Sequence, residues 1–303
     1  MRIARAYTSK EKVVKFDGHY HSWHDWHRFG YLQAGHLYSG GIPRSIEDDY
    51  FILPWNDPEK LKILRKFGNS IAAVICEPVV GNCGCIMPKD GYLEELRETC
   101  NEQDIVLIFD EVVTGFRLGL GGAQSRLGVI PDLAVFGKAV ANGFPIALVA
   151  GREEIMMTKN VAIGGTFNSN PISCAAALAT IEELEDRRNY EKMNNLGRLL
   201  MEGVNDAIQD VGVEAIVQGY PELFSIIFTD QDKIRSPNDL YSIKFHPHLR
   251  REVVFCQEML NGGIFNAARR GNRWVLSIAH ERKDIDKTIE VAEKSLKMAK
   301  KIS

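Results

Sequence analysis

Four continuous apolar runs stand out in the first part of the chain. They are Ile71 to Cys76, Val106 to Phe109, Leu133 to Phe136 and Ala147 to Ala150. None of them alternates between apolar and polar positions as a strand with one wet face does, so we expect strands that are covered on both faces. Strands of this kind are typical of a largely parallel sheet in an α/β domain.

The segment between the first two runs has a helical pattern. Within Gly91 to Gln103, apolar residues recur at Leu93, Leu96 and Cys100, which is the spacing of one helix face. This segment is predicted to be the crossover helix of a right-handed βαβ unit. Further on, the sequence from Asn168 to Pro171 is typical of a helix start, and an Ala-rich helix is expected after it.

The pattern changes near residue 188, beyond which helices and short strands form an α+β arrangement. Expected helices cover Tyr190 to Asp210, Pro247 to Leu260 and the chain from Asp284, and expected strands cover Val213 to Val217, Phe224 to Phe228 and Trp274 to Ala279. We therefore predict two domains. Residues 1–188 form the large α/β domain, and residues 189–303 form a small C-terminal α+β domain.

The composition narrows the class of protein. With 45% hydrophobic and 25% charged residues, the 303-residue chain has material for a large globular core. Its formal net charge of -3 offers no basic surface for nucleic acid. No apolar run approaches the roughly 18 residues that cross a bilayer, and the N-terminus lacks the apolar core of a signal peptide, so we expect no membrane partner and a cytoplasmic location. A small molecule is the expected partner.

The cysteines are predicted to be buried, reduced thiols, because none of them forms a Cys-x-x-Cys pair and several lie in apolar or helical surroundings. The turn Cys83-Gly84-Cys85 is interpreted as a tight backbone turn rather than a redox pair. The six cysteines are Cys76, Cys83, Cys85, Cys100, Cys174 and Cys256.

Histidines are concentrated near the N-terminus, at His19, His21, His24, His27 and His36. Two imidazoles on one side of an extended strand would suit a metal ion. Their spacing matches no known zinc pattern, however, and the aromatic residues between them favour the wall of a cofactor pocket, so we expect no metal. The glycine-rich stretch at 119–122 lacks the spacing of a dinucleotide-binding turn and is predicted to be a loop.

A carboxylate and a lysine each follow one of the apolar runs. Asp110 comes directly after Phe109, and Lys138 follows Phe136 after one glycine. Ligands of open α/β sheets bind outside the carboxyl ends of the strands, so both side chains are expected to reach one crevice. A neutral lysine forms Schiff bases, and a carboxylate can keep a pyridinium nitrogen protonated, which makes the ring an electron sink. Taken singly, each residue is more often a solvated loop charge or a helix cap.

Longer strings around these two residues resemble the class III aminotransferases, which use pyridoxal 5'-phosphate (PLP). The matching stretches are Phe16 to His21, Glu77 to Asn82, Asp110 to Arg117, Pro131 to Lys138 with Gly143-Phe144-Pro145, Gly165 to Pro171, and Ser277 to His280. They span essentially all of the chain in the family's order, and glutamate-1-semialdehyde 2,1-aminomutase-like members are the nearest likeness. The resemblance implies PLP-dependent transferase fold type I, which is the aspartate aminotransferase-like fold.

The resemblance implies roles at the ring of the cofactor. Lys138 would be the catalytic Schiff-base lysine and would carry the proton between carbon atoms, and Asp110 would pair with the pyridinium nitrogen. Tyr20 would stack on one face of the ring, and Val112 would pack on the opposite face. His21 belongs to the same cofactor-binding stretch as Tyr20.

Three further positions are implied to surround the cofactor. Asn82 would hydrogen-bond to the 3-hydroxyl group, and Glu77 would support that side of the site. Thr166 would contact the phosphate group in the site of a neighbouring subunit. The expected assembly is therefore a homodimer acting on a small amino or keto compound.

Two departures from the family pattern leave alternatives open. Family members extend much further at the N-terminus, where a small-residue turn cradles the phosphate. The chain is therefore a fragment, a protein completed by a separate chain, or a non-catalytic remnant. The segment after Lys138 also lacks the Gly-rich run of typical aminomutases. A transaminase for another substrate, such as an ω-amino compound or a sugar, is the alternative to an aminomutase.

Overall fold

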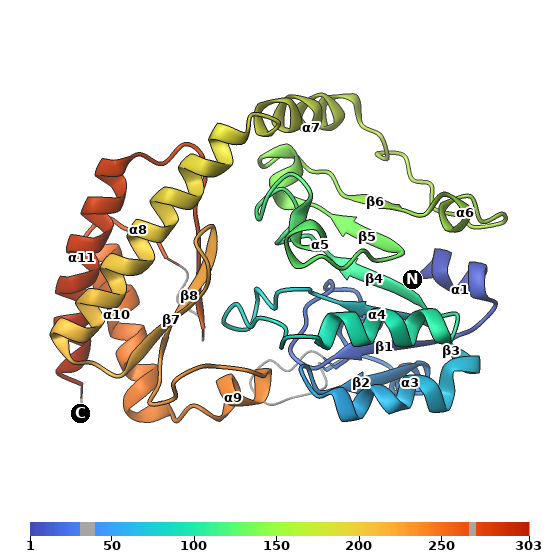
Figure 1. Cartoon of the computed structure of the whole chain (residues 1–303), viewed down its shortest axis with the longest axis horizontal. Helices are drawn as coiled ribbons and strands as arrows, with labels where there is room; N and C mark the ends of the chain where they lie inside the picture. The colour runs from blue at the N-terminus through green and yellow to red at the C-terminus, as the bar shows by residue number, and fades with distance from the viewer. Residues whose placement is uncertain (31–39, 267–270, 303) are drawn as a thin grey trace. The chain divides into compact units, whose positions relative to one another are not determined.

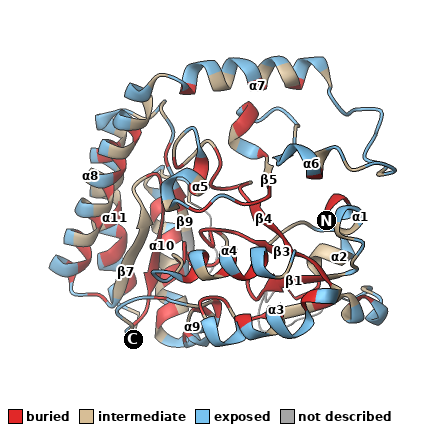
Figure 2. Cartoon of the chain, turned by 45° about the vertical axis from the view of Figure 1, so that its right-hand side comes forward, coloured by how far each residue is buried: buried red, intermediate tan, exposed pale blue. Residues whose placement is uncertain are grey.

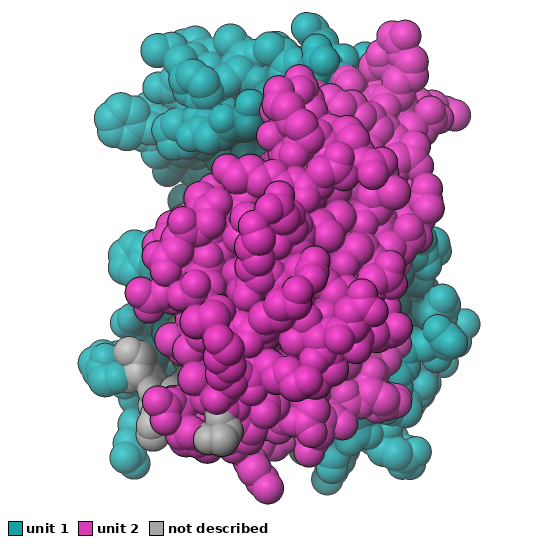
Figure 3. Space-filling model, turned by 90° about the vertical axis from the view of Figure 1, so that its left-hand side faces the viewer, with its two compact units in different colours: residues 1–79, 88–185 teal, residues 80–87, 186–303 magenta. Residues whose placement is uncertain are grey.

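The computed structural model describes residues 1–30, 40–266 and 271–302 and divides the chain into two compact units (Figure 3). The first unit consists of residues 1–79 and 88–185, and the second consists of residues 80–87 and 186–303. The segment 80–87, which the sequence analysis placed in the large domain, groups with the second unit. His36, which belongs to the histidine cluster, lies outside the described residues.

The first unit is built on a six-stranded sheet with the order β2-β1-β3-β4-β5-β6 (Figure 1). All neighbouring pairs are parallel except β5 and β6, which are antiparallel. This mostly parallel sheet confirms the predicted α/β class. The strands are β1 (Lys12–Phe16), β2 (Tyr50–Leu53), β3 (Ile71–Cys76), β4 (Val106–Asp110), β5 (Leu133–Phe136) and β6 (Leu148–Gly151).

The centre of this sheet is buried along its length, as the apolar runs predict. Every residue of β3 and β4 is buried (Figure 2). The connection between them is α4, and its residues Leu93, Leu96 and Cys100 are buried, which confirms the βαβ unit. The helices of this unit are α1 (Arg2–Thr8), α2 (Asp25–Arg28), α3 (Lys62–Phe67), α4 (Tyr92–Glu102), α5 (Gly122–Leu127), α6 (Glu153–Met156) and α7 (Pro171–Leu184).

Strand β6 differs from the prediction. It lies at an edge of the sheet and runs antiparallel to β5, and most of its residues are exposed, with Val149 45% exposed. The expectation of cover on both faces is therefore wrong for this run. A continuous apolar run indicates a strand but does not indicate whether the strand lies at the centre or the edge of its sheet.

Strand β1 was not among the clearest strands in the sequence, because lysines interrupt its apolar residues. In the structure Val13, Val14 and Phe16 are buried on its two faces, and Lys15 is buried as well. The strand pairs with β2 on one side and β3 on the other. Because β1 runs parallel to both neighbours, the residues that follow it lie at the carboxyl edge of the sheet.

The second unit has a three-stranded antiparallel sheet, β7-β8-β9, with its own hydrophobic core. Its last helix buries Ile285, Ala292, Leu296 and Ala299, with Ile289 packed against the same core, as its apolar stripe predicts. The elements are α8 (Arg187–Val211), β7 (Ala215–Tyr220), β8 (Leu223–Phe228), α9 (Pro237–Ser242), α10 (Arg250–Asn261), β9 (Asn272–Val275) and α11 (Arg282–Lys300).

Two general properties of the described residues bear on the predictions. All six cysteines are free thiols, and all except Cys174 are buried. Among the helices of residues 1–30, 40–266 and 271–302, none is both long and apolar enough to span a bilayer.

Candidate active site

Asp110 and the backbone just before Lys138 end two adjacent parallel strands. In the register of β4 and β5, Asp110 lies opposite Val135, and the next amide, that of Glu111, donates to the Val135 carbonyl at 2.9 Å. Lys138 follows three residues later. Because parallel strands end at the same edge of a sheet, both residues lie at the carboxyl edge, where open α/β sheets bind ligands.

The backbone at Lys138 has an unusual conformation. Its φ angle is 47°, in the left-handed region that a residue with a Cβ atom seldom adopts. It begins a short 3₁₀ turn, Lys138–Ala141, directly after the extended Gly137. Strained residues of this kind cluster at ligand-binding and catalytic sites. Lys138 is one of ten non-glycine residues with a positive φ angle in the described part of the chain, so its backbone conformation is consistent with a role in a site.

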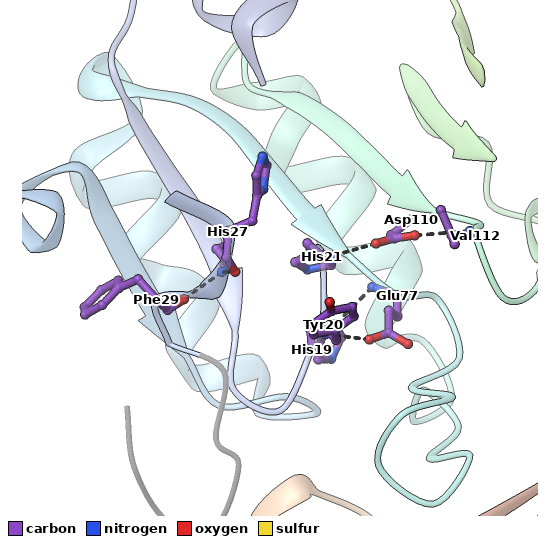
Figure 4. Close-up of polar contacts among 9 residues, drawn as sticks. His19, Tyr20, His21, His27, Phe29, Glu77, Asp110 and Val112 are labelled. Atoms are coloured by element: carbon purple, nitrogen blue, oxygen red, sulfur yellow. Dashed lines mark hydrogen bonds and ion pairs between the residues drawn. The ribbon is translucent and has the colours of Figure 1, made fainter. Parts of the chain in front are cut away.

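Asp110 is held in one orientation by two donors (Figure 4). Its Oδ2 atom lies 2.8 Å from Nδ1 of His21, and its Oδ1 atom accepts from the backbone N–H of Val112 at 3.1 Å. The whole residue is only 7% exposed. A carboxylate has further lone pairs beyond these two bonds, so Asp110 can still accept a proton donor from a ligand.

His21 is the buried partner of this carboxylate, and its side chain has no exposed surface. Burial lowers the pKa of His21, while the hydrogen bond to Asp110 and the charge of Asp110 oppose that change. The ring is therefore neutral at pH 7, with the Nδ1–H donating to Asp110. Its Nε2 atom is buried and has no hydrogen-bond partner in the described part of the chain.

Two further hydrogen bonds attach His19 and Tyr20, which follow β1, to Glu77, which follows β3. The Glu77 carboxylate accepts from the backbone N–H of Tyr20 at 2.7 Å, and the Glu77 N–H donates to Nδ1 of His19 at 2.9 Å. Burial is the main cause that lowers the pKa of His19 well below its usual value, so His19 is a neutral acceptor. Three neighbouring strands thus bring Tyr20, Glu77 and Asp110 into one network (Figure 4).

Val112 lies beside the residue that precedes Lys138. A Cβ atom placed on Gly137 would be 3.6 Å from Cγ1 of Val112, which is ordinary van der Waals contact. The turn that carries Val112 is fixed by Glu111, whose buried carboxylate accepts from the N–H groups of Ala123 and Gln124 at the start of α5, both at 2.9 Å. This role of Glu111 could not be predicted from the sequence, since nothing in the spacing of the residues indicates a contact with a helix twelve positions away.

Asn82 and Thr166 are the other two residues that the sequence predicts to bind the cofactor. Asn82 belongs to the second unit, where its side-chain oxygen accepts from Arg273 at 3.3 Å. Thr166 belongs to the first unit and lies in an exposed turn, next to Phe167, which is 83% exposed. The roles predicted for both residues stay predictions.

A cavity of about 510 Å³ lies at the amino ends of the strands, where it is lined by Val106, Asp132 and Arg152 among others. The buried Asp132 accepts from Arg97 at 2.9 Å and from the Leu107 N–H at 2.8 Å, so this motif residue ties β5 to α4 and β4. The cavity is therefore at the opposite edge of the sheet from Asp110.

In the described residues, no three His, Cys, Asp or Glu side chains group as a metal site would.

Comparisons with known proteins agree with this geometry. The sequence model of the family Aminotransferase class-III matches residues 1–275. Glutamate-1-semialdehyde 2,1-aminomutase from Methanopyrus kandleri is 39% identical over 98% of this chain and 70% of its own length. The chain thus spans about 70% of that relative.

Two solved structures have the same fold. A crystal structure of an omega-transaminase from Sphaerobacter thermophilus superposes with a TM-score of 0.91 at 28% identity, over 99% of this chain and 71% of the other. A structure described as a transaminase with PLP bound gives a TM-score of 0.85 at 27% identity, over 98% of this chain and 70% of the other. Both confirm the predicted fold type.

Proposed function

Because this chain belongs to the class-III aminotransferase family, we propose that it is a PLP-dependent amino-group-transferring enzyme in which Lys138 carries the cofactor as a Schiff base. The observation that supports this most is the delivery of Asp110 and Lys138 to one sheet edge by adjacent parallel strands. When bound, PLP withdraws electrons from the reacting carbon of the substrate.

The residues of the chain suit that cofactor. The fixed Asp110 carboxylate would hold the proton on the ring nitrogen, and His21 and the Val112 N–H keep the carboxylate from turning away. Lys138 would hold the cofactor and move a proton between carbon atoms of the substrate. Tyr20 and Val112 would cover the two faces of the ring and exclude water from it.

The remaining assignments are proposed on the family likeness. Asn82 would bond to the 3-hydroxyl group of the cofactor, and Glu77 would support that side through Tyr20. The exposed turn at Thr166 would supply a phosphate contact to the second subunit of a homodimer. Residues 1–188 would form the PLP-binding domain, and residues 189–303 the small domain.

The test is cofactor uptake by the purified chain. Added PLP is expected to give an absorption band near the edge of the visible range, and borohydride is expected to fix the cofactor covalently on the peptide that contains Lys138. Lys138→Ala should abolish both signals, whereas the exposed Lys159→Ala should keep them. A wild-type chain without a band, or with label on other lysines only, would refute the assignment.

The proposed substrate is an amino aldehyde of the glutamate-1-semialdehyde type, because the 39% identical relative is an aminomutase. An aminomutase moves the amino group within one molecule and needs no second substrate. The alternative is a transaminase for another amino or keto compound, which the omega-transaminase structure at a TM-score of 0.91 favours. Turnover of glutamate-1-semialdehyde alone supports the first; turnover that requires both an amino donor and a keto acceptor supports the second.

A further inference from the structure

Lys15 in strand β1 is a lysine with no exposed surface. Its ammonium group donates to the backbone carbonyls of His27 and Phe29, the latter at 2.6 Å, and lies 5.5 Å from the centre of the Tyr50 ring. No carboxylate in the described part of the chain pairs with it. Burial, and then the charge of Arg28, lowers the pKa of Lys15 to about 7. A lysine is costly to bury without a counter-ion, which indicates a task that an apolar residue would not perform.

The two carbonyls lie at the C-terminal end of α2. Carbonyls at a helix end have no partner within the helix, and α2 has only four residues, so it has few hydrogen bonds of its own. The bonds from Lys15 therefore fix the position of this helix end against the central strand β1.

Arg28 stands between those two carbonyls in the chain. Its guanidinium carbon lies 5.9 Å from the centre of the Tyr20 ring, within the range of a cation–π contact. The backbone of Tyr20 is already held by Glu77. The contact with Arg28 involves the ring itself, and a continuous path of contacts runs from Lys15 through the end of α2 to Tyr20.

We propose that Lys15 is a positioning residue that holds the end of α2 so that Arg28 stays against Tyr20 and sets the orientation of its ring. This inference rests on the proposed function, in which the Tyr20 ring covers the cofactor. Lys15 itself touches no reacting atom in this scheme. Its effect on cofactor binding should therefore depend on the presence of the Tyr20 side chain.

A double-mutant cycle on PLP affinity tests this dependence. Lys15→Met keeps an unbranched side chain that is one atom shorter and removes both hydrogen bonds. It is expected to weaken PLP binding about tenfold, as is common for residues in one contact network. In a Tyr20→Leu background the same change should have less than about a twofold effect. Equal loss in both backgrounds overturns the proposal, because Lys15 would then act on the fold in general.

Lys12 provides a matched control on the same strand. Its ammonium also donates to a backbone carbonyl, that of Asp48, which belongs to the 3₁₀ turn Arg44–Asp49 and not to α2. Lys12→Met should change PLP affinity by less than about twofold. If Lys15→Met fails to fold, Arg28→Met tests the same path with Lys15 intact, and it should reproduce the affinity loss and its dependence on Tyr20.

Hydrogen exchange without PLP separates this proposal from the proposed function. Amides of residues 20–29 should exchange faster in Lys15→Met than in the wild type or in Lys12→Met, while those of β3 stay protected. Unchanged exchange in residues 20–29 overturns the positioning role. If the wild-type chain binds no PLP, the proposed function fails, and the exchange result still decides whether Lys15 holds this segment.

Discussion

The hydrogen bond between His21 and Asp110 allows a quantitative prediction about the stability of the cofactor-free protein. His21→Phe keeps an aromatic ring in the same space and removes the Nδ1–H donor. The bond is 2.8 Å long, and the exposed fractions of the two side chains are 0% and 9%, so water can scarcely replace the lost donor.

The expected size follows from the charge of the acceptor and its burial. A hydrogen bond to a charged group contributes about 1.5–3 kcal/mol, and little of this is lost to solvent screening here. In a cycle with Asp110→Ala, the coupling free energy between the two positions is therefore expected to be about 1.5–3 kcal/mol. This range corresponds to a change of roughly 10- to 150-fold in the unfolding equilibrium constant.

Urea unfolding of the wild type, the two single variants and the double variant at pH 7 measures this coupling, with the slope checked to be constant across the four proteins. His24→Phe is the control. His24 is exposed, and its backbone N–H, rather than its ring, donates to the Ser22 hydroxyl. Its coupling to Asp110→Ala should be near zero. A coupling below about 0.5 kcal/mol for His21 would refute the claim that this bond fixes Asp110.

Three further predictions concern the pH dependence and the packing. Burial is the main cause that lowers the pKa of His27 to about 3. As the pH falls below 6.5, the unfolded chain therefore takes up a proton that the folded chain does not, and the unfolding free energy of the wild type should fall by about 1.4 kcal/mol per pH unit more steeply than that of His27→Leu. Equal slopes between pH 6.5 and 4 in urea titrations contradict this. Gly122→Ala should destabilise the chain by about 1–3 kcal/mol, because φ is +63° and the new Cβ would lie 2.7 Å from Oε2 of Glu111. An unchanged midpoint of thermal unfolding would show that the turn does not need glycine. Leu296→Ala should lower the free energy of unfolding in urea by about 2–5 kcal/mol, because Leu296 of α11 is fully buried. Met298→Ala should lower it by less than about 0.5 kcal/mol, because Met298 is 41% exposed. Similar losses at both positions would contradict the apolar stripe assigned to α11.

The sequence identified the elements that carry their own local signal. The strands Ile71–Cys76 and Leu133–Phe136 were predicted with the bounds that the structure gives them, because each is an unbroken run of apolar residues, which indicates a strand. The helix face of α11 was predicted for a similar reason, since its spacing defines one apolar stripe. Lys138 was singled out by its place after a strand, although its backbone φ of 47° was visible only in the structure.

Contacts between distant segments were not available from the sequence. His21 and Asp110 are 89 positions apart, and the two ends of the bond between Tyr20 and Glu77 are 57 apart, so no local periodicity relates them. Strand β1 was hidden because its lysines break the apolar pattern, and Lys15 has the composition of a solvent-facing residue although it is fully buried. Only the pairing of β1 with both β2 and β3 shows that it lies inside the sheet rather than at its edge.

The amino-acid sequence by itself determined the strands and helices that have a clear local pattern, such as β3, β5 and α11, and which residue types follow them, because these depend on the spacing of apolar side chains along one piece of chain. The tertiary structure alone decided the order of the strands, the exposure of β6 at the edge of the sheet, and the partners of Asp110 and Lys15. The physical reason is that a side chain's burial and hydrogen bonds depend on which distant segments pack beside it, and spacing along the chain does not specify those segments.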